Sequence, residues 1–381
     1  MFFQPRFHYS HAAVSHLGKI EAARAVIEVL PLPPDQALFL RQAARQRATR
    51  NSTAIEGNKL NTMEIRRAVV ATGKSDSEMQ QEVRNYWRAL EWVEQQLEAR
   101  RQITEDFIKE LHCIIVVRGR GRRGQKSDYR TEECPVVDAE TNSIDYAPPR
   151  PGDIEDLMKG MMRWLQVEEA KELPGPVRAG LLAHRFVSIH PFNDGNGRTA
   201  RALATAELWR SGYDMRGFLS LEEHYTADLH AYYHSLQMGL PVDFYEGRND
   251  PDHTPWLNYF LRTMAAAANS LKEQAVKLFD PDHRPTPPWD GLNRTQQQLL
   301  TRLLVRALSE KKEALTFSPG DVVEWYGVSP ATSREWLEKW KDDGFVMPEK
   351  ADVQRVRAYR LTERWESLLQ TAIHSNSDKN S

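Results

Sequence analysis

The chain has 381 residues, of which 40% are hydrophobic and 27% are charged, and its formal net charge is −2. This composition is typical of a soluble globular protein with two or three domains, and it gives no sign of nucleic-acid binding through overall charge. Two cysteines argue against a disulfide framework or a thiolate zinc site. Because long apolar runs and a signal-peptide pattern are both missing, we expect a cytoplasmic protein without a membrane partner.

The first part of the chain, residues 1–103, is predicted to be a helical region. Apolar residues recur at helical spacing in residues 19–30, 37–57 and 77–100, and a proline-rich stretch separates the first two of these segments. We therefore expect long helices that bury one face against the rest of the protein.

Residues 104–279 are predicted to form a second, central unit that is also mainly helical. Residues 130–149 differ from their surroundings, since they contain a short apolar pair, turn-forming residues and a double proline. This pattern predicts a small β-hairpin. A run rich in arginine and glycine at 118–126 precedes it and is expected to be a solvated loop, the alternative being a basic patch that attracts ATP or an acidic target.

The last part of the chain reads as a separate unit behind a linker. Residues 280–290 contain four prolines without periodicity and predict a linker. Residues 291–370 predict a helix, a helix–turn–helix with its turn at Gly327 and its second helix capped by Ser329, and then a strand pair within 351–362. This is the order of elements in a winged helix. Residues 371–381 are expected to be a tail.

The greatest density of chemical groups lies in "IHPFNDGNGRTAR", residues 189–201. The segment falls between two predicted helices, at the N-terminus of the second. Unpaired backbone N–H groups and the helix dipole favour an anion there, and Gly195 and Gly197 allow the backbone to approach it closely. Arg198 and Arg201 are neighbours on a helix surface, so both can hold the same phosphate groups.

Two further residues of this segment suit reactions at a phosphate. His190 has a pKa range appropriate for a general base, and Asp194 offers a hard oxygen ligand for Mg²⁺. The segment is not a Walker A loop, because no lysine follows the glycines, and it is not a serine-hydrolase elbow. Each residue alone is more often structural than catalytic, so the argument depends on their spacing taken together.

Residues 190–201, "HPFNDGNGRTAR", resemble the signature of the Fic family, HxFx[DE]GNGRxxR, at every defined position. Residues 52–57, "STAIEG", resemble the inhibitory motif [ST]xxxE[GN] of the same family. The segments "YRTEECPVV" and "YAPP" are similar to the family's flap, a β-hairpin that aligns the target polypeptide. The order of the units resembles that of bacterial Fic proteins with a C-terminal winged helix. The resemblance thus predicts a mainly α fold: a Fic-type helical core, a hairpin flap and a winged-helix domain.

The resemblance implies an enzyme that transfers AMP from ATP to a Ser, Thr or Tyr hydroxyl of a target protein, or of the chain itself. His190 is then the general base, and Asp194 holds Mg²⁺ between the α- and β-phosphates. In this interpretation the flap residues are Val136 and Val137, and the inhibitory residues are Ser52 and Glu56. The nucleotide contacts are Gly195, Asn196, Gly197, Arg198, Thr199, Arg201, Tyr232 and Asn249.

Glu56 acquires a specific role in this interpretation. A carboxylate that pairs with Arg201 prevents this arginine from orienting the γ-phosphate, so we expect Glu56 to hold the enzyme in an autoinhibited state. The alternative is that Glu56 is an ordinary acid on a helix surface, which the residue by itself would favour.

Two other functions remain open from the sequence. One keeps the fold but transfers another phospho-group or removes AMP from a target. The other is a regulator that binds DNA through the winged helix and senses ATP with the core. The predicted recognition helix mixes acidic and basic residues, which favours protein contact or a homodimer over DNA.

Overall fold

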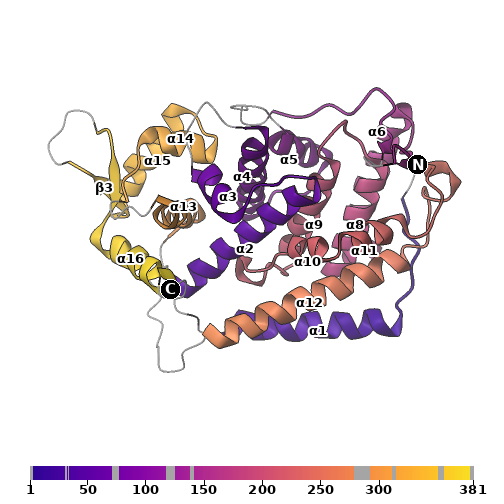
Figure 1. Cartoon of the computed structure of the whole chain (residues 1–381), viewed down its shortest axis with the longest axis horizontal. Helices are drawn as coiled ribbons and strands as arrows, with labels where there is room; N and C mark the ends of the chain where they lie inside the picture. Colours follow the sequence, from indigo (N-terminus) through magenta and orange to yellow (C-terminus); the bar gives the residue numbers. More distant parts are fainter. Residues whose placement is uncertain are drawn as a thin grey trace.

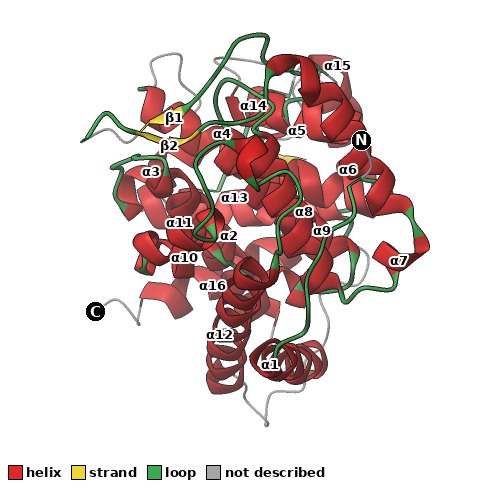
Figure 2. Cartoon of the chain, turned by 90° about the vertical axis from the view of Figure 1, so that its right-hand side faces the viewer, coloured by secondary structure: helices red, strands yellow, loops and turns green. Residues whose placement is uncertain are grey.

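The structure, a computed structural model, describes residues 3–30, 32, 34–70, 77–116, 125–137, 141–278, 292–310, 315–350 and 356–377. These residues form a helical protein with two small two-stranded sheets, which confirms the predicted mainly α fold (Figures 1 and 2). None of the helices in these ranges combines the length and the apolar character that a membrane crossing requires.

The main body is built around a pair of buried helices that flank the signature segment. Helix α8 (Gly175–Ile189) packs against α9 (Asn196–Arg210), and α12 (Thr254–Leu278) covers α8. Helix α1 (His11–Val29) lies along α12 at the edge of the molecule (Figure 1). The remaining helices of this body are α3 (Thr62–Val70), α4 (Glu78–Glu98), α5 (Glu105–Val116), α6 (Ile154–Gln166), α7 (Glu168–Lys171), α10 (Glu222–Ala227) and α11 (Leu229–Gln237), with three short 3-10 turns, η1 (Pro151–Asp153), η2 (Met215–Gly217) and η3 (Phe244–Glu246).

One apolar cluster extends through this body from Phe3 to Ala275. Buried residues of α1, α4, α5, α8, α9 and α12 contribute to it together. The predicted boundary between residues 103 and 104 therefore does not coincide with a break in packing, and the N-terminal helical region and the central unit share a core. The helices between residues 11 and 98 bury their apolar faces on the central unit, because each of them is too narrow to form a core alone.

Helix α2 (Pro34–Ile55) connects this body to the C-terminal unit (Figure 1). Leu38, near its start, belongs to the apolar cluster of the C-terminal unit, whereas Ala48 and Ile55, toward its end, belong to that of the main body. Ala37 and Leu40, beside Leu38, also belong to the cluster of the main body, so α2 packs against both units near its start and against the main body toward its end.

The C-terminal unit contains α13 (Arg294–Glu310), α14 (Pro319–Tyr326), α15 (Pro330–Asp342), β3 (Val346–Pro348), β4 (Tyr359–Leu361) and α16 (Glu363–Ser377). Gly327 ends α14 in a left-handed conformation with φ 62°, and the Ser329 side chain caps α15, as the sequence predicted. Strands β3 and β4 are antiparallel. The element order agrees with a winged helix, an assignment that stays a prediction.

Two predictions for this unit were wrong in placement. Of the strand pair expected within 351–362, the described residues 356–362 contain β4, and its partner β3 lies earlier, where the apolar residues Phe345 and Val346 reach the core. The tail expected from 371 begins inside α16, which continues to Ser377. The predicted linker at 280–290 and most of the basic run at 118–126 lie outside the described residues.

Candidate active site

The signature segment forms a sharp turn between α8 and α9. His190 follows the last residue of α8 in a left-handed conformation with φ 50°, which is uncommon for a residue other than glycine. Gly195 caps α9 with φ 75°. A Cβ at Gly195 would also lie 2.6 Å from the Val116 side chain, so both backbone conformation and space require glycine there. Strained backbone of this kind is often found where a fold positions functional groups.

Two side chains hold the turn in shape. The Asn196 amide donates to the Phe192 carbonyl at 2.7 Å, and its oxygen accepts from the Phe192 N–H at 3.1 Å. His112 of α5 stacks on the Phe192 ring with centroids 3.6 Å apart, and its Nε2 donates to the Asp194 carbonyl at 2.7 Å. Burial lowers the pKa of His112 to about 4, so it is neutral and accepts from the Ser127 hydroxyl. The sequence analysis missed His112, whose position in an apolar helix gave no signal.

The environment of His190 keeps its imidazole neutral. Burial, with a smaller contribution from the Arg130 guanidinium, lowers its pKa from an ordinary 6.5 to about 4, although a backbone hydrogen bond to Val187 and the charges of Glu56 and Asp194 act in the opposite direction. A backbone hydrogen bond to Val187 occupies one ring nitrogen. The other nitrogen is then free of a proton at neutral pH, which is the state that a general base requires.

Arg201 of α9 is bound to the predicted inhibitory motif. Its Nη2 donates to a Glu56 carboxylate oxygen at 2.7 Å and to the Ser52 carbonyl at 2.9 Å, and its Nε donates to the Ser52 hydroxyl at 2.9 Å. Arg201 is 5% exposed. Burial disfavours its charge, but the Glu56 carboxylate, together with Tyr232 and Tyr86, more than offsets burial, so the pKa of Arg201 is raised. The structure thus brings together the two motifs, which are 145 residues apart in the chain.

The Glu56 carboxylate also lies against the start of α9. A Cβ added to Gly197 would overlap one of its oxygens and would come within 3.2 Å of Arg201 Nη1. A negative charge is favoured at this position by the unpaired N–H groups and the dipole of the helix. Glu56 therefore occupies the position at which the first turn of α9 would receive an external anion.

Comparison with known proteins agrees with this geometry. Residues 102–208, which include the whole turn and α9 up to Leu208, match the Fic/DOC family. Residues 102–208 therefore correspond to a Fic domain. The chain is 36% identical over 170 residues to a protein named protein adenylyltransferase Fic from Nematostella vectensis, and 34% identical over 169 residues to a protein of the same name from Drosophila melanogaster. These matches cover 43% of this chain but only 37% and 32% of those proteins, so the chain spans about a third of the length of the curated relatives it matches.

Solved structures extend the likeness in fold beyond the matched segment. A Fic family protein from Desulfovibrio desulfuricans superposes with a TM-score of 0.58 over 95% of this chain and 99% of that chain, at 23% identity. A Fic domain containing signaling protein from Bacteroides thetaiotaomicron gives a TM-score of 0.56 over 70% of this chain and 97% of that chain. At this identity the likeness concerns the fold alone, and it confirms the Fic-type helical core.

Arg198, the other arginine of the signature segment, is also bound by carboxylates. Arg198 Nη2 donates to both carboxylate oxygens of Asp194 at 2.9 and 3.1 Å, and its Nη1 donates to Glu82 of α4 at 3.1 Å. The Asn58 amide donates to the other oxygen of Glu82 at 2.9 Å. Glu82 was not predicted from the sequence, because a single glutamate in a charged helix carries no pattern.

One observation on the described residues supports nucleotide binding, and another supports Mg²⁺ binding. Arg198 Nε and Thr199 Oγ1 are buried without a hydrogen-bond partner within the described part of the chain, so polar atoms at the start of α9 remain available. The Asp194 side chain is 76% exposed, so its carboxylate is accessible to an ion from solvent. No cluster of three or more possible metal ligands occurs in the described ranges. Mg²⁺ commonly uses only one or two protein carboxylates and takes its other ligands from phosphates and water.

Three other residues predicted to contact the nucleotide have different surroundings. Tyr232 of α11 is 4% exposed, and its hydroxyl accepts from Arg201 at 3.5 Å. Thr199 is completely buried. Asn249 accepts hydrogen bonds from Arg185 of α8, through its backbone oxygen at 2.8 Å and its side chain at 3.4 Å. Their roles in nucleotide binding stay predictions. The neighbouring Tyr233 donates to the Ile55 carbonyl at 3.2 Å and so contacts the end of α2.

The predicted hairpin is present beside the turn. Strand β1 (Val136–Val137) pairs with β2 (Ile144–Tyr146) in antiparallel fashion, with an irregular register between its two valines (Figure 2). The two valines are 36% and 42% exposed. Arg130, missed in the sequence analysis, donates through Nε to the His190 carbonyl at 2.8 Å and through Nη2 to the Pro149 carbonyl. Arg130 therefore fixes the base of the hairpin to the general-base candidate.

Proposed function

We propose that this protein is a protein adenylyltransferase that transfers AMP from ATP to a hydroxyl side chain and is held inactive by Glu56. The observation that carries the proposal is the position of the Glu56 carboxylate, which bonds Arg201 and lies against Gly197 at the start of α9. The relatives named protein adenylyltransferase Fic support the same reaction class.

In the proposed reaction the target hydroxyl approaches between the hairpin and the turn. His190 takes the hydroxyl proton on its free ring nitrogen, the hydroxyl oxygen forms a bond to the α-phosphorus, and the bond from that phosphorus to the pyrophosphate breaks. Arg198 and the backbone N–H groups of Gly195 and Gly197 stabilise the negative charge on the leaving pyrophosphate. Mg²⁺ held by Asp194 would neutralise part of the phosphate charge.

Glu56 restrains this reaction by competing for the groups that position ATP. Arg201 cannot orient the γ-phosphate while it bonds Glu56, and a second anion at Gly197 would lie next to the carboxylate. Glu82 provides a similar restraint on Arg198. Since catalysis of phosphoryl-type transfer depends on positioning and charge stabilisation, occupied arginines suffice to keep the rate low.

The exposed edge of β1 is the proposed docking site for the target. Main-chain groups of an edge strand can pair with an extended peptide, and this mode of recognition depends little on the target's side chains. The target can be another protein or a second copy of this chain. For the C-terminal unit we favour contact with protein over contact with DNA, because α15 pairs Lys341 with Glu338 on its own surface and presents no basic stripe.

Labelling with radioactive ATP tests the proposal. Wild type, Glu56→Gly and the double variant Glu56→Gly/His190→Ala are incubated with ATP labelled at the α-phosphate and, separately, at the γ-phosphate. We expect α-label on protein with Glu56→Gly, little with wild type and none with the double variant. Transfer of the γ-label would indicate phosphorylation, and release of AMP from a premodified protein would indicate the reverse reaction. Equal α-labelling by wild type and Glu56→Gly would contradict autoinhibition.

A further inference from the structure

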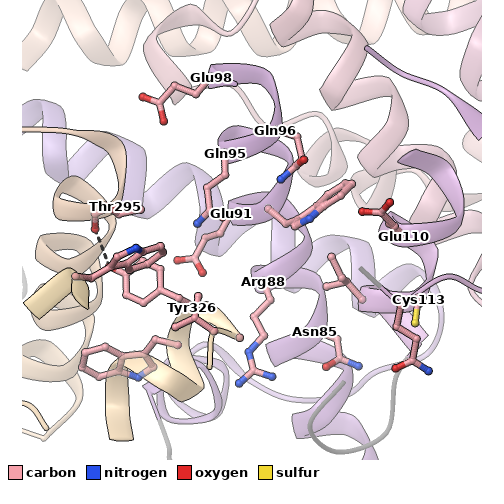
Figure 3. Close-up of a pocket in the computed structure, with 17 residues that line it drawn as sticks. Asn85, Arg88, Glu91, Gln95, Gln96, Glu98, Glu110, Cys113, Thr295 and Tyr326 are labelled. Atoms are coloured by element: carbon pink, nitrogen blue, oxygen red, sulfur yellow. Dashed lines mark hydrogen bonds between the residues drawn. The ribbon is translucent and has the colours of Figure 1, made fainter. Parts of the chain in front are cut away.

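A cleft of about 310 Å³ lies between the main body and the C-terminal unit, away from the signature turn (Figure 3). One wall comes from α4 and α5, and the other comes from α14, the turn after it, and α15. Four aromatic residues line it: Trp92, Trp325, Tyr326 and Trp336. This size and aromatic lining are typical of sites for small organic molecules, which often form between two units of a protein.

Most polar side chains of the cleft already have partners. Glu91 bonds Arg302, Glu110 bonds Arg101 at 2.7 and 2.9 Å, and Gln95 donates to Gln298 at 3.0 Å. The Tyr326 hydroxyl donates to the Thr295 carbonyl at 2.7 Å (Figure 3). These groups shape the walls and need nothing further from a ligand.

Two buried nitrogen donors are exceptions. Arg88 and Trp325 line the cleft, and their buried nitrogens Arg88 Nε and Trp325 Nε1 have no hydrogen-bond partner within the described part of the chain. Trp325 is only 2% exposed. Arg88 extends from α4 between Tyr326 on one side and Asn85 on the other (Figure 3). A buried donor without an acceptor costs free energy, so both nitrogens favour a ligand that carries oxygen acceptors.

The charge around Arg88 specifies the acceptor further. Burial is the main cause that lowers the pKa of Arg88 to about 10; repulsion from Arg302 and Arg84 acts in the same direction, and Glu324 and Glu91 act against it. The backbone oxygen of Glu324 accepts from Arg88 Nη2 at 2.5 Å. A guanidinium in such surroundings is stabilised by an additional negative charge, and a carboxylate matches its donors in geometry.

We propose that this cleft binds a small molecule with a flat aromatic body and a carboxylate. The aromatic body packs among Trp92, Tyr326 and Trp336, and the carboxylate accepts from Arg88. The site contacts both units at once, and its Glu91 also bonds Arg45 of α2, the helix that ends at the inhibitory motif. The inference stands on this cleft alone and does not depend on the chemistry at the signature turn.

Isothermal titration of the full chain with naphthoate and with neutral naphthamide tests the proposal. We expect saturable binding of naphthoate with quenching of tryptophan fluorescence, and affinity for naphthamide about tenfold or more weaker, since one hydrogen-bonded charge is lost. Arg88→Met should reduce naphthoate affinity to that of naphthamide. Arg67→Met, which removes an exposed arginine of α3, is the matched control and should change nothing.

A second variant keeps the test decisive if Arg88→Met fails to fold. Trp336→Ala removes a half-buried aromatic wall and should weaken both probes by a similar factor. Equal affinity for the two probes, unchanged naphthoate binding in Arg88→Met, or unchanged binding in Trp336→Ala would each overturn the proposal. Binding that survives in a correctly folded Arg88→Met protein would place the probe elsewhere.

Discussion

Two buried arginines in this protein pair with glutamates far away in the chain, and the two pairs differ in how fully they are enclosed. Arg302 of α13 bonds Glu91 of α4, which also accepts from Arg45 at 3.3 Å and from the Trp87 indole at 2.8 Å. Arg201 bonds Glu56 through a single nitrogen, and the Glu56 side chain is 30% exposed.

The difference indicates that the two arginine–glutamate ion pairs have different roles. The Arg302 pair is enclosed, and Arg302 also donates to the Val69 and Trp325 carbonyls, so opening it would strand several polar groups. In the Arg201 pair the Glu56 carboxylate is partly exposed to solvent. When this pair opens, water can therefore solvate the Glu56 charge. The first is suited to a permanent junction between the two units, and the second is suited to a switch.

The largest effect is expected at the junction. Arg302→Met should lower the free energy of unfolding by about 3–5 kcal/mol, because it leaves Glu91 buried with fewer partners. Urea denaturation followed by circular dichroism measures this, with Arg67→Met as the control at an exposed position. A loss as small as that of the control would mean that the junction is not held by this pair.

The switch pair should respond in activity and hardly in stability. Glu56→Gln keeps the size of the side chain and removes its charge, and we expect self-labelling by ATP to rise about ten- to a hundredfold, as loss of a charged hydrogen bond of roughly 1.5–3 kcal/mol would allow. The free energy of unfolding should change by less than that of Arg302→Met. If Glu56→Gln were as destabilising as Arg302→Met, the two pairs would have the same role.

A smaller effect is expected at Glu82. Glu82→Gln frees Arg198 from α4 but leaves its bonds to Asp194, so labelling in a Glu56→Gln background should rise only about two- to fivefold, the value of a partly exposed charge pair. Quantitative labelling of the single and double variants measures the increment. Glu78→Gln, at the exposed start of the same helix, is the control variant. An equal rise in labelling with Glu78→Gln would show that the increase does not come from the release of Arg198.

The smallest effect is expected from pH. Because burial lowers the pKa of His190 to about 4, its base form persists well below neutrality, and removal of the Glu56 carboxylate takes away an influence that raises this pKa. Labelling by Glu56→Gln should therefore stay level from about pH 8 to about pH 5.5, whereas an ordinary imidazole would lose its base form in this range. An inflection near the ordinary pKa would show that His190 is not in the described environment during the reaction.

The sequence by itself determined the parts that depend on local order. The turn between α8 and α9, the glycines at its bends, the hairpin at 136–146 and the serine-capped helix at Ser329 follow from short-range conformational rules. The signature spacing also indicated which residues gather at the start of α9, since neighbours on one helix turn must share a surface.

Only the tertiary structure decided which distant groups meet these residues. His112, Arg130 and Glu82 hold the turn, the hairpin and Arg198, yet each is a single polar residue without a pattern in its own segment. The shared core across residue 103 and the attachment of α2 to both units arise from side-chain packing between segments distant in sequence. Periodicity specifies that a helix has an apolar face, but the shape and charge of the surfaces available in three dimensions select the partner that covers it.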